Sequence, residues 1–210
     1  MTETAVMTPA PLRPSKKREQ ILQSARGVFL DHGYEGASMD AIAAEAQVSK
    51  ATVYAHFADK QALFAEMVAE YCREQQAALA EIEAEHPRVQ EGLERLARVM
   101  MRYLAAPNAL RFGRMIVGES ARFPELGRTF VDSGFLALQA DIAGFLGRAA
   151  ERGELDLPDP ALAAELFVSM VRGPVQFRSL RALGAPPDDT ALDRIASEAA
   201  RLLVTAYARK

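Results

Sequence analysis

Apolar residues recur throughout the chain at the 3.6-residue period of an α-helix, and this period constrains the fold more than any other feature of the sequence. Alternating runs of β-branched residues, which are typical of strands, are absent from the sequence. Half of the 210 residues are hydrophobic and a quarter are charged, so the chain can bury a large core. The sequence therefore predicts an all-α protein.

Capping residues, prolines and glycines divide this pattern into separate helices. A residue that can cap a helix N-terminus precedes each of the first four predicted helices: Ser15, Ser38, Ser49 and Asp59. Gly33 stands at the expected end of the first helix, where a residue with a positive φ often terminates a helix. The second helix is expected to run to about residue 46, the third over 50–57, and the fourth to about residue 85. Further helices are predicted at 88–105, 108–122, 125–152, 159–183 and 189–208.

The predicted helix at 50–57 has two unlike faces. Val53 and Phe57, spaced i and i+4, face the preceding short helix, whereas the other positions point outward. Two short helices joined by the turn "QVS", with a polar outer face on the second, are typical of a helix-turn-helix whose second helix enters the major groove of DNA. The alternative is a pair of ordinary surface helices.

The outward side chains carry groups that suit DNA. Lys50 can donate to guanine or to phosphate, and the methyl group of Thr52 can contact a thymine. Tyr54 and His56 can donate to phosphate oxygens. Ser38 offers a hydroxyl and a backbone N–H to a phosphate at a helix N-terminus. The net charge of −3 does not by itself indicate a nucleic-acid-binding protein, so this inference depends on the local pattern.

Residues 18–68 closely resemble the DNA-binding region of the TetR family of transcriptional regulators. The matching elements are Ala25, Phe29 and the pattern "GY.G.SM..IA..A.VSK.T.Y.HF..K..LF", all in order and spacing. The resemblance implies a homodimeric, all-helical protein that usually represses and releases its operator when a small molecule binds. It places the following residues at DNA-contact positions: Ser38, Lys50, Ala51, Thr52, Tyr54, His56 and Lys60. Lys17, in a cluster of basic residues, and Met39, beside Ser38, are further candidate contacts. Ala55 departs from the aromatic residue often found there.

The resemblance also implies a division of the chain into three parts. These are a tail at 1–14, which its three prolines predict to be flexible, a three-helix DNA-binding domain at 15–60 and a larger helical domain for ligand binding and dimerisation at 61–210. Within the larger domain, "GRMIVGESARFPELGRTF" is similar to the AefR-like branch of the family. The fourth helix is expected to shift on ligand binding and so to change the spacing of the two DNA-binding domains.

Glu119 lies within an apolar stripe of the helix at 108–122, where a carboxylate needs a partner. It can form an internal salt bridge with Arg172 or Arg178, or it can be the polar anchor of a pocket for a lipophilic cation or a hydroxylated aromatic molecule. Met and Phe at helical spacing are often plain core, but they can line the same pocket. The candidate pocket residues are Met100, Tyr103, Phe112, Met115, Glu119, Phe135, Phe167, Met170 and Phe177.

The last predicted helix carries a narrow apolar seam that suits close helix–helix association. We expect it, together with the helix at 159–183, to supply two of the four helices of a dimer interface, although docking within the monomer is the alternative. The seam consists of Leu192, Ile195, Ala199, Leu202 and Ala206.

The expected partners are therefore double-stranded operator DNA, a second copy of the chain and a small-molecule effector. We expect no membrane segment, cofactor, metal site or catalytic residue. The three histidines have no evident nucleophile beside them, and "EIEAEH" spreads its carboxylates around a helix. A single cysteine, Cys72, favours the reducing cytoplasm. A helical module that binds protein, or a transcriptional activator of the same fold, remains the alternative.

Overall fold

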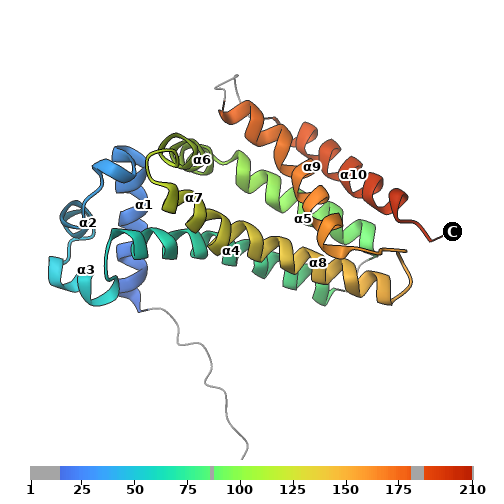
Figure 1. Ribbon diagram of the computed structural model, residues 1–210, viewed down its shortest axis with the longest axis horizontal. Helices are drawn as coiled ribbons and strands as arrows, with labels where there is room; N and C mark the ends of the chain where they lie inside the picture. The colour runs from blue at the N-terminus through green and yellow to red at the C-terminus, as the bar shows by residue number, and fades with distance from the viewer. Residues whose placement is uncertain (1–14, 86–87, 181–186, 210) are drawn as a thin grey trace, which may run out of the picture.

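The computed structural model describes residues 15–85, 88–180 and 187–209, and the predicted tail at 1–14 lies outside them. Ten α-helices and one π-helical segment make up this part of the chain, with no strand among the described residues. Figure 1 shows α1, α2 and α3 gathered at one end of an elongated molecule, with α4 running from them along the remaining helices. The all-α fold predicted from the sequence is confirmed.

The four N-terminal helices begin where the capping residues predict. They are α1 (Lys16–Gly36), α2 (Met39–Glu45), α3 (Lys50–His56) and α4 (Lys60–Ala84). In each case the cap side chain accepts a hydrogen bond from the backbone N–H three residues later, over 3.2, 3.1, 3.1 and 2.7 Å. These bonds satisfy N–H groups that have no acceptor within the helix.

The remaining helices form a second bundle. They are α5 (Val89–Ala105), α6 (Pro107–Glu119), α7 (Pro124–Phe130), the π-helical η1 (Val131–Phe135), α8 (Leu136–Glu151), α9 (Pro160–Leu180) and α10 (Asp189–Ala206). The single helix expected at 125–152 is therefore interrupted by a π-helical turn. No helix of the described chain is long and apolar enough to cross a membrane.

Two apolar cores underlie this arrangement. The larger one joins α5, α8, α9, α10 and the end of α4. The smaller one joins α1, α2 and α3 to the first turns of α4, up to Val68, and also takes in Phe112 and Ile116 of α6 and Leu126 of α7. The domain boundary predicted at residue 60 therefore does not coincide with the packing, because α4 enters both cores and α6 packs against the N-terminal helices.

Aromatic rings hold α6 against the N-terminal helices. Phe64 of α4 meets Phe29 edge-on at 5.6 Å between ring centroids and meets Tyr34 at 5.4 Å. Phe112 of α6 lies 5.6 Å from Phe64, and Phe123 lies 5.5 Å from Tyr34. Such pairs contribute about 0.5–1.5 kcal/mol each beyond the burial of their area. These rings therefore pack α6 into the smaller core, together with the N-terminal helices.

Helix α1 contains a break at Gly33, whose φ of 71° and ψ of 176° are open to glycine but strained for other residues. The predicted positive φ is confirmed, but the chain resumes a helical turn to Gly36 before α2 begins.

Candidate nucleic-acid interface and ligand pocket

Helices α2 and α3 pack through small and branched residues around a tight turn. Ile42 and Val53 are completely buried, and Ala43 is nearly so. Gln47 adopts a φ of 52° in the turn, where the N–H of Val48 donates to the carbonyl of Ala43. This left-handed residue after a helix reverses the chain within three residues. The helix-turn-helix geometry expected from the sequence is present.

The outer face of α3 is open to solvent. Lys50, Ala51, Tyr54, Ala55 and His56 are exposed, and Tyr54 keeps 46% of its surface accessible. Because Val53 anchors the inner face, these side chains are presented together on one surface. Thr52 is half-buried, and its hydroxyl lies 2.8 Å from that of Ser49.

Asp40 of α2 is a residue of this surface that the sequence reasoning missed. The amine of Lys50 lies 2.8 Å from Asp40 Oδ1 and donates to Oδ2 over 3.0 Å. This hydrogen bond, together with the charge of the carboxylate, raises the pKa of Lys50. The amine also lies 6.0 Å from the centroid of the Tyr54 ring. Asp40 therefore orients Lys50, and the Lys50 amine can leave this carboxylate to bind a phosphate or a base instead. The ten-residue spacing between two helices gives no local signal for such a pair.

The other predicted DNA contacts divide into two groups. Lys17 and Ser38 are exposed, and the Ser38 hydroxyl caps α2. Met39 is 7% exposed and packs in the smaller core, so the predicted contact from its side chain is not supported. The Lys60 amine donates to the carbonyls of Tyr34 (2.6 Å) and Ala37 (3.0 Å), and burial lowers its pKa. Its predicted phosphate contact is likewise not supported, because the amine already holds the end of α1.

Glu119 has backbone partners that were not predicted from the sequence. Its carboxylate accepts hydrogen bonds from the backbone N–H groups of Tyr34 (2.8 Å) and Glu35 (3.1 Å), at the break in α1. Arg172 instead lies over the ring of Phe135, at 4.9 Å from its centroid. The side chain of Arg178 lies outside the described residues. Glu119 thus connects α6 to the N-terminal helices rather than to a pocket.

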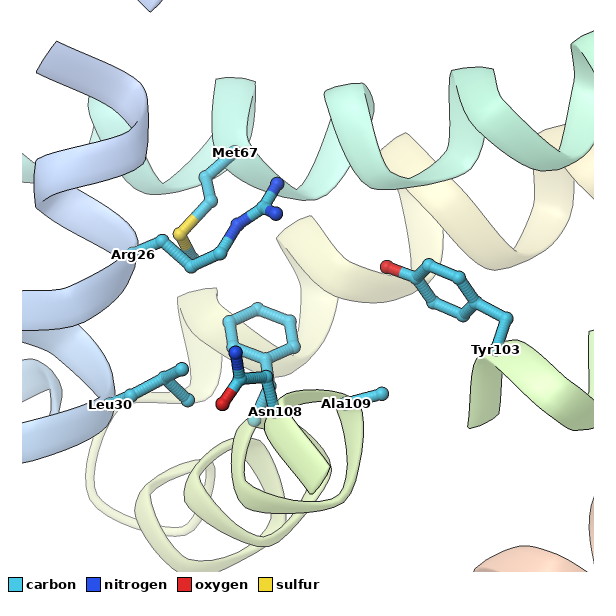
Figure 2. Close-up of a pocket in the computed structure, with 7 residues that line it drawn as sticks. Arg26, Leu30, Met67, Tyr103, Asn108 and Ala109 are labelled. Atoms are coloured by element: carbon cyan, nitrogen blue, oxygen red, sulfur yellow. The ribbon is translucent and has the colours of Figure 1, made fainter. Parts of the chain in front are cut away.

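A small cavity opens between α1, α4, α5 and α6, as Figure 2 shows. Its volume is about 50 Å³. Leu30, Met67, Ala109 and Phe112 supply apolar contacts, while the polar ends of three side chains reach the same space: Arg26, Tyr103 and Asn108. Burial raises the pKa of the Tyr103 phenol. The hydroxyl is therefore neutral at physiological pH and can act as a hydrogen-bond donor.

This cavity adjoins a wider polar cleft of about 650 Å³, with which it shares Arg26, Leu30 and Asn108. The cleft is also lined by Arg111 of α6 and Glu70 of α4. Arg26 and Glu70 approach to 3.6 Å across it. A wide polar cleft therefore lies directly beside the apolar cavity.

The predicted pocket residues do not converge on one cavity. Tyr103 and Phe112 line the space in Figure 2, whereas Met100 and Phe167 are completely enclosed in the larger core. Phe177 is 55% exposed on α9. Of the others, Met115 packs against the smaller core, and Phe135 and Met170 against the larger one. Helical spacing identified inward faces but could not distinguish a filled core from a void.

Helices α9 and α10 present an apolar surface to solvent. Of the predicted seam, Ile195 is half-buried, Leu202 is 45% exposed and Ala206 is exposed. Leu192 and Ala199 are buried within the protomer. A shallow groove of about 440 Å³ runs over Met170, Ile195 and Leu202. The helix at 159–183 was expected in this surface, but its exposed residues were not identified as part of it: Leu162, Leu166 and Phe177.

Comparison with known proteins gives two family matches. Residues 21–67 match the family described as bacterial regulatory proteins, tetR family, and residues 91–209 match the AefR-like transcriptional repressor, C-terminal domain. The HTH-type transcriptional repressor AcnR of Corynebacterium glutamicum is 36% identical over 58 residues, which cover 28% of this chain and 31% of that protein. The match therefore spans about a third of the length of this curated relative.

Solved structures match over nearly the whole chain. A TetR-family transcriptional regulator from Mesorhizobium loti MAFF303099 superposes with a TM-score of 0.80 at 28% identity, covering 93% of this chain and 98% of that one. The flavonoid-responsive regulator FrrA superposes with a TM-score of 0.74 at 32% identity, covering 94% of this chain and 100% of that one.

Proposed function

Because the chain belongs to the TetR family of bacterial transcriptional regulators, we propose that it represses transcription by binding an operator as a homodimer, and that a small aromatic effector releases it. The single observation that carries the DNA-binding part is the exposed outer face of α3, held by the buried Val53. Its N-terminal residues would face base edges in the major groove, as in other helix-turn-helix proteins. The site needs no catalytic group, and the proposed place of action is the cytoplasm, where operator DNA is found.

The proposed contacts follow from the chemistry of that face. Lys50 donates to guanine or phosphate once it leaves Asp40, while Tyr54 and His56 donate to phosphate oxygens. Lys17 and the N-terminus of α2 at Ser38 add backbone contacts. Ala51 and Ala55 allow close approach of the helix to the groove. Since binding displaces counterions, affinity falls steeply with salt.

A homodimer is supported by the apolar surface of α9 and α10. Leu162, Leu166, Phe177 and Leu202 are each between 45% and 55% exposed, and burial of such side chains is favourable. A twofold axis through this surface would bring two copies of α3 into one complex. Two recognition helices about 34–36 Å apart meet successive major grooves of B-DNA.

The effector is proposed to be a hydroxylated aromatic molecule that binds in the polar cleft and widens the cavity at Tyr103, because the 50 Å³ present is smaller than an aromatic ring needs. Leu30, Met67 and Phe112 provide an apolar surface, while Tyr103 and Asn108 can hydrogen-bond phenolic groups. The cavity does not suit the lipophilic cation considered from the sequence, for two reasons. Arg26 lines it with a positive charge, and Glu119, the expected counter-charge, lies outside it. FrrA, which matches at 32% identity, is described as flavonoid-responsive, and flavonoids are polyphenols.

A gel-shift experiment on the DNA that flanks its own gene tests the proposal. We expect a specific complex at 50 mM salt that weakens by roughly 10³-fold or more at 200 mM. Lys50→Ala and Tyr54→Ala should each weaken it, whereas Glu151→Gln, at an exposed position on α8, should not. A panel of flavonoids and simpler phenols should then dissociate the parent complex. Binding that ignores salt and both α3 variants would indicate a protein-interaction module instead.

A further inference from the structure

The break in α1 leaves backbone groups that α6 satisfies from both sides. Tyr34 and Glu35 begin a new helical turn after Gly33, so their N–H groups lie where a helix supplies no acceptor. Both donate to Glu119, one to each carboxylate oxygen, over 2.8 and 3.1 Å. On the other side of the break, Arg111 of α6 donates to the carbonyl of Leu30 over 2.9 Å and to Asp31 over 2.7 Å. Residues eight apart on α6 therefore hold both sides of the break.

Gly33 allows the contact to be this close. A Cβ atom at this position would collide with Oε1 of Glu119. Arg122, just beyond the end of α6, forms an ion pair with Glu35. The bond lengths, the positive φ and the missing side chain are consistent with one another. We call this close contact of Glu119 with residues 33–35 the α1–α6 joint.

The corner of the chain at residues 33–37 is also held by α4. Lys60, the first residue of that helix, donates to the carbonyls of Tyr34 and Ala37, and its amine lies 4.4 Å from the centroid of the Tyr34 ring. The corner at 33–37 is therefore held by hydrogen bonds both to Glu119 and from Lys60. The next residue, Ser38, caps α2 and begins the DNA-facing surface. The position of α6 consequently affects the placement of α2 and, through it, of α3.

The proposed effector cavity separates the two helices that this joint connects. Leu30 lines the cavity with its side chain while its carbonyl accepts from Arg111. Asn108, Ala109 and Phe112 line the opposite wall and belong to α6. A molecule inserted there would push α6 away from α1. Packed helices move as units, so this displacement would reach Glu119, at the end of the same helix.

We propose that Glu119 is a positioning residue for DNA binding, which ties α6 to the corner at 33–37 and carries displacement of α6 to the recognition helix. This inference rests on the proposed function and deepens it. It names a route through α1 in addition to the shift of α4 expected from the family. A ligand acts on such a two-state element only through different affinities for its two arrangements.

The test compares Glu119→Gln and Glu119→Ala with the parent, and Glu151→Gln serves as the matched control on an exposed helix position. The glutamine carbonyl oxygen can accept from one of the two N–H groups, but its NH2 group is a donor and cannot accept from the other. One of the two hydrogen bonds of this clamp, formed by Glu119 with Tyr34 and Glu35, is therefore lost. Alanine loses both bonds. We expect operator affinity to fall by about tenfold or more for Glu119→Ala and by less for Glu119→Gln, because hydrogen bonds to a charged group are the stronger class. Affinity for random duplex should change by less than twofold.

A merely structural role predicts a different outcome. In that case Glu119→Ala would lower the thermal midpoint and leave the ratio of operator to random-duplex affinity unchanged, and this result would overturn the proposal. Operator affinity within twofold of the parent would do the same. Backbone hydrogen exchange separates this inference from the proposed function: protection of the Tyr34 and Glu35 amides should be lost in Glu119→Ala but kept in Glu151→Gln. If the parent binds no DNA, the proposed function fails, while the exchange result still decides whether the clamp exists.

Discussion

Gly33→Ala is predicted to destabilise the protein strongly, whereas Gly27→Ala on the same helix is predicted to stabilise it. Gly33 has a φ of 71°, and a Cβ there would meet the carboxylate of Glu119. Gly27 has ordinary helical geometry, and a Cβ there would meet no atom within 4 Å. The two substitutions are chemically identical, so any difference between them reports on the joint.

The structure sets the size of each effect. An alanine in the strained region at Gly33 costs about 1–3 kcal/mol. Displacement of Glu119 forfeits a hydrogen bond to a charged group, worth about 1.5–3 kcal/mol. Together these terms reach about 2.5–6 kcal/mol, a large fraction of the roughly 5–15 kcal/mol that stabilises a typical domain. At Gly27, replacing glycine by alanine inside a helix gains about 0.5–1 kcal/mol.

Urea denaturation followed by circular dichroism measures both variants, at one protein concentration because the stability of the proposed dimer would depend on it. The midpoint should fall for Gly33→Ala and rise for Gly27→Ala. In a Glu119→Ala background, Gly33→Ala should cost only its backbone part, since the carboxylate is gone. The reasoning is refuted if Gly33→Ala lies within 1 kcal/mol of the parent, or if the cost is the same in both backgrounds.

Three further predictions concern other parts of the molecule. Asp40→Asn should bind random duplex several-fold more tightly at low salt, measured by fluorescence anisotropy, because it removes an anion from the DNA-facing surface and releases Lys50; unchanged binding would contradict this. Leu166→Glu should yield monomers in sedimentation equilibrium, since it places a charge on the α9–α10 surface. The control Val117→Glu, at an exposed position of α6, should leave the proposed dimer intact. A stable dimer of Leu166→Glu would argue against that interface. Burial alone would raise the pKa of Glu66, but hydrogen bonds from Arg18 and Arg73 outweigh it and lower that pKa below the usual value of a glutamate. A depressed carboxyl pKa contributes stability above the unfolded value that is lost as pH falls, so Glu66→Gln should lower the free energy of unfolding at pH 7 and make little difference near pH 3; an equal effect at both values would exclude this electrostatic origin.

Features that depend on a few neighbouring residues could be predicted from the sequence. The caps at Ser15, Ser38, Ser49 and Asp59 are hydrogen bonds across three residues, so local spacing suffices to find them. The division of α3 into a buried Val53 and exposed outer positions follows from the helical period alone. The family could also be identified from the sequence, because the motif of its DNA-binding region lies within one continuous segment.

Contacts between distant segments could not be predicted in this way. Glu119 was correctly identified as a carboxylate in need of a partner, but its partners are backbone groups 85 and 84 residues away, which carry no side-chain signature. Lys60 was assigned to DNA by analogy, yet its amine faces the carbonyls that the break in α1 leaves at the corner.

By itself, the amino-acid sequence determined where the first four helices begin, which faces they bury and which face of α3 is left exposed, because these depend on periodicity and capping within each segment. The tertiary structure alone decided that α4 and α6 join the two cores, that Arg26 and Tyr103 share a cavity, and that Glu119 closes the break at Gly33. The physical reason is that an inward-facing position specifies burial but not the partner it meets, and the partner depends on how whole helices pack against one another.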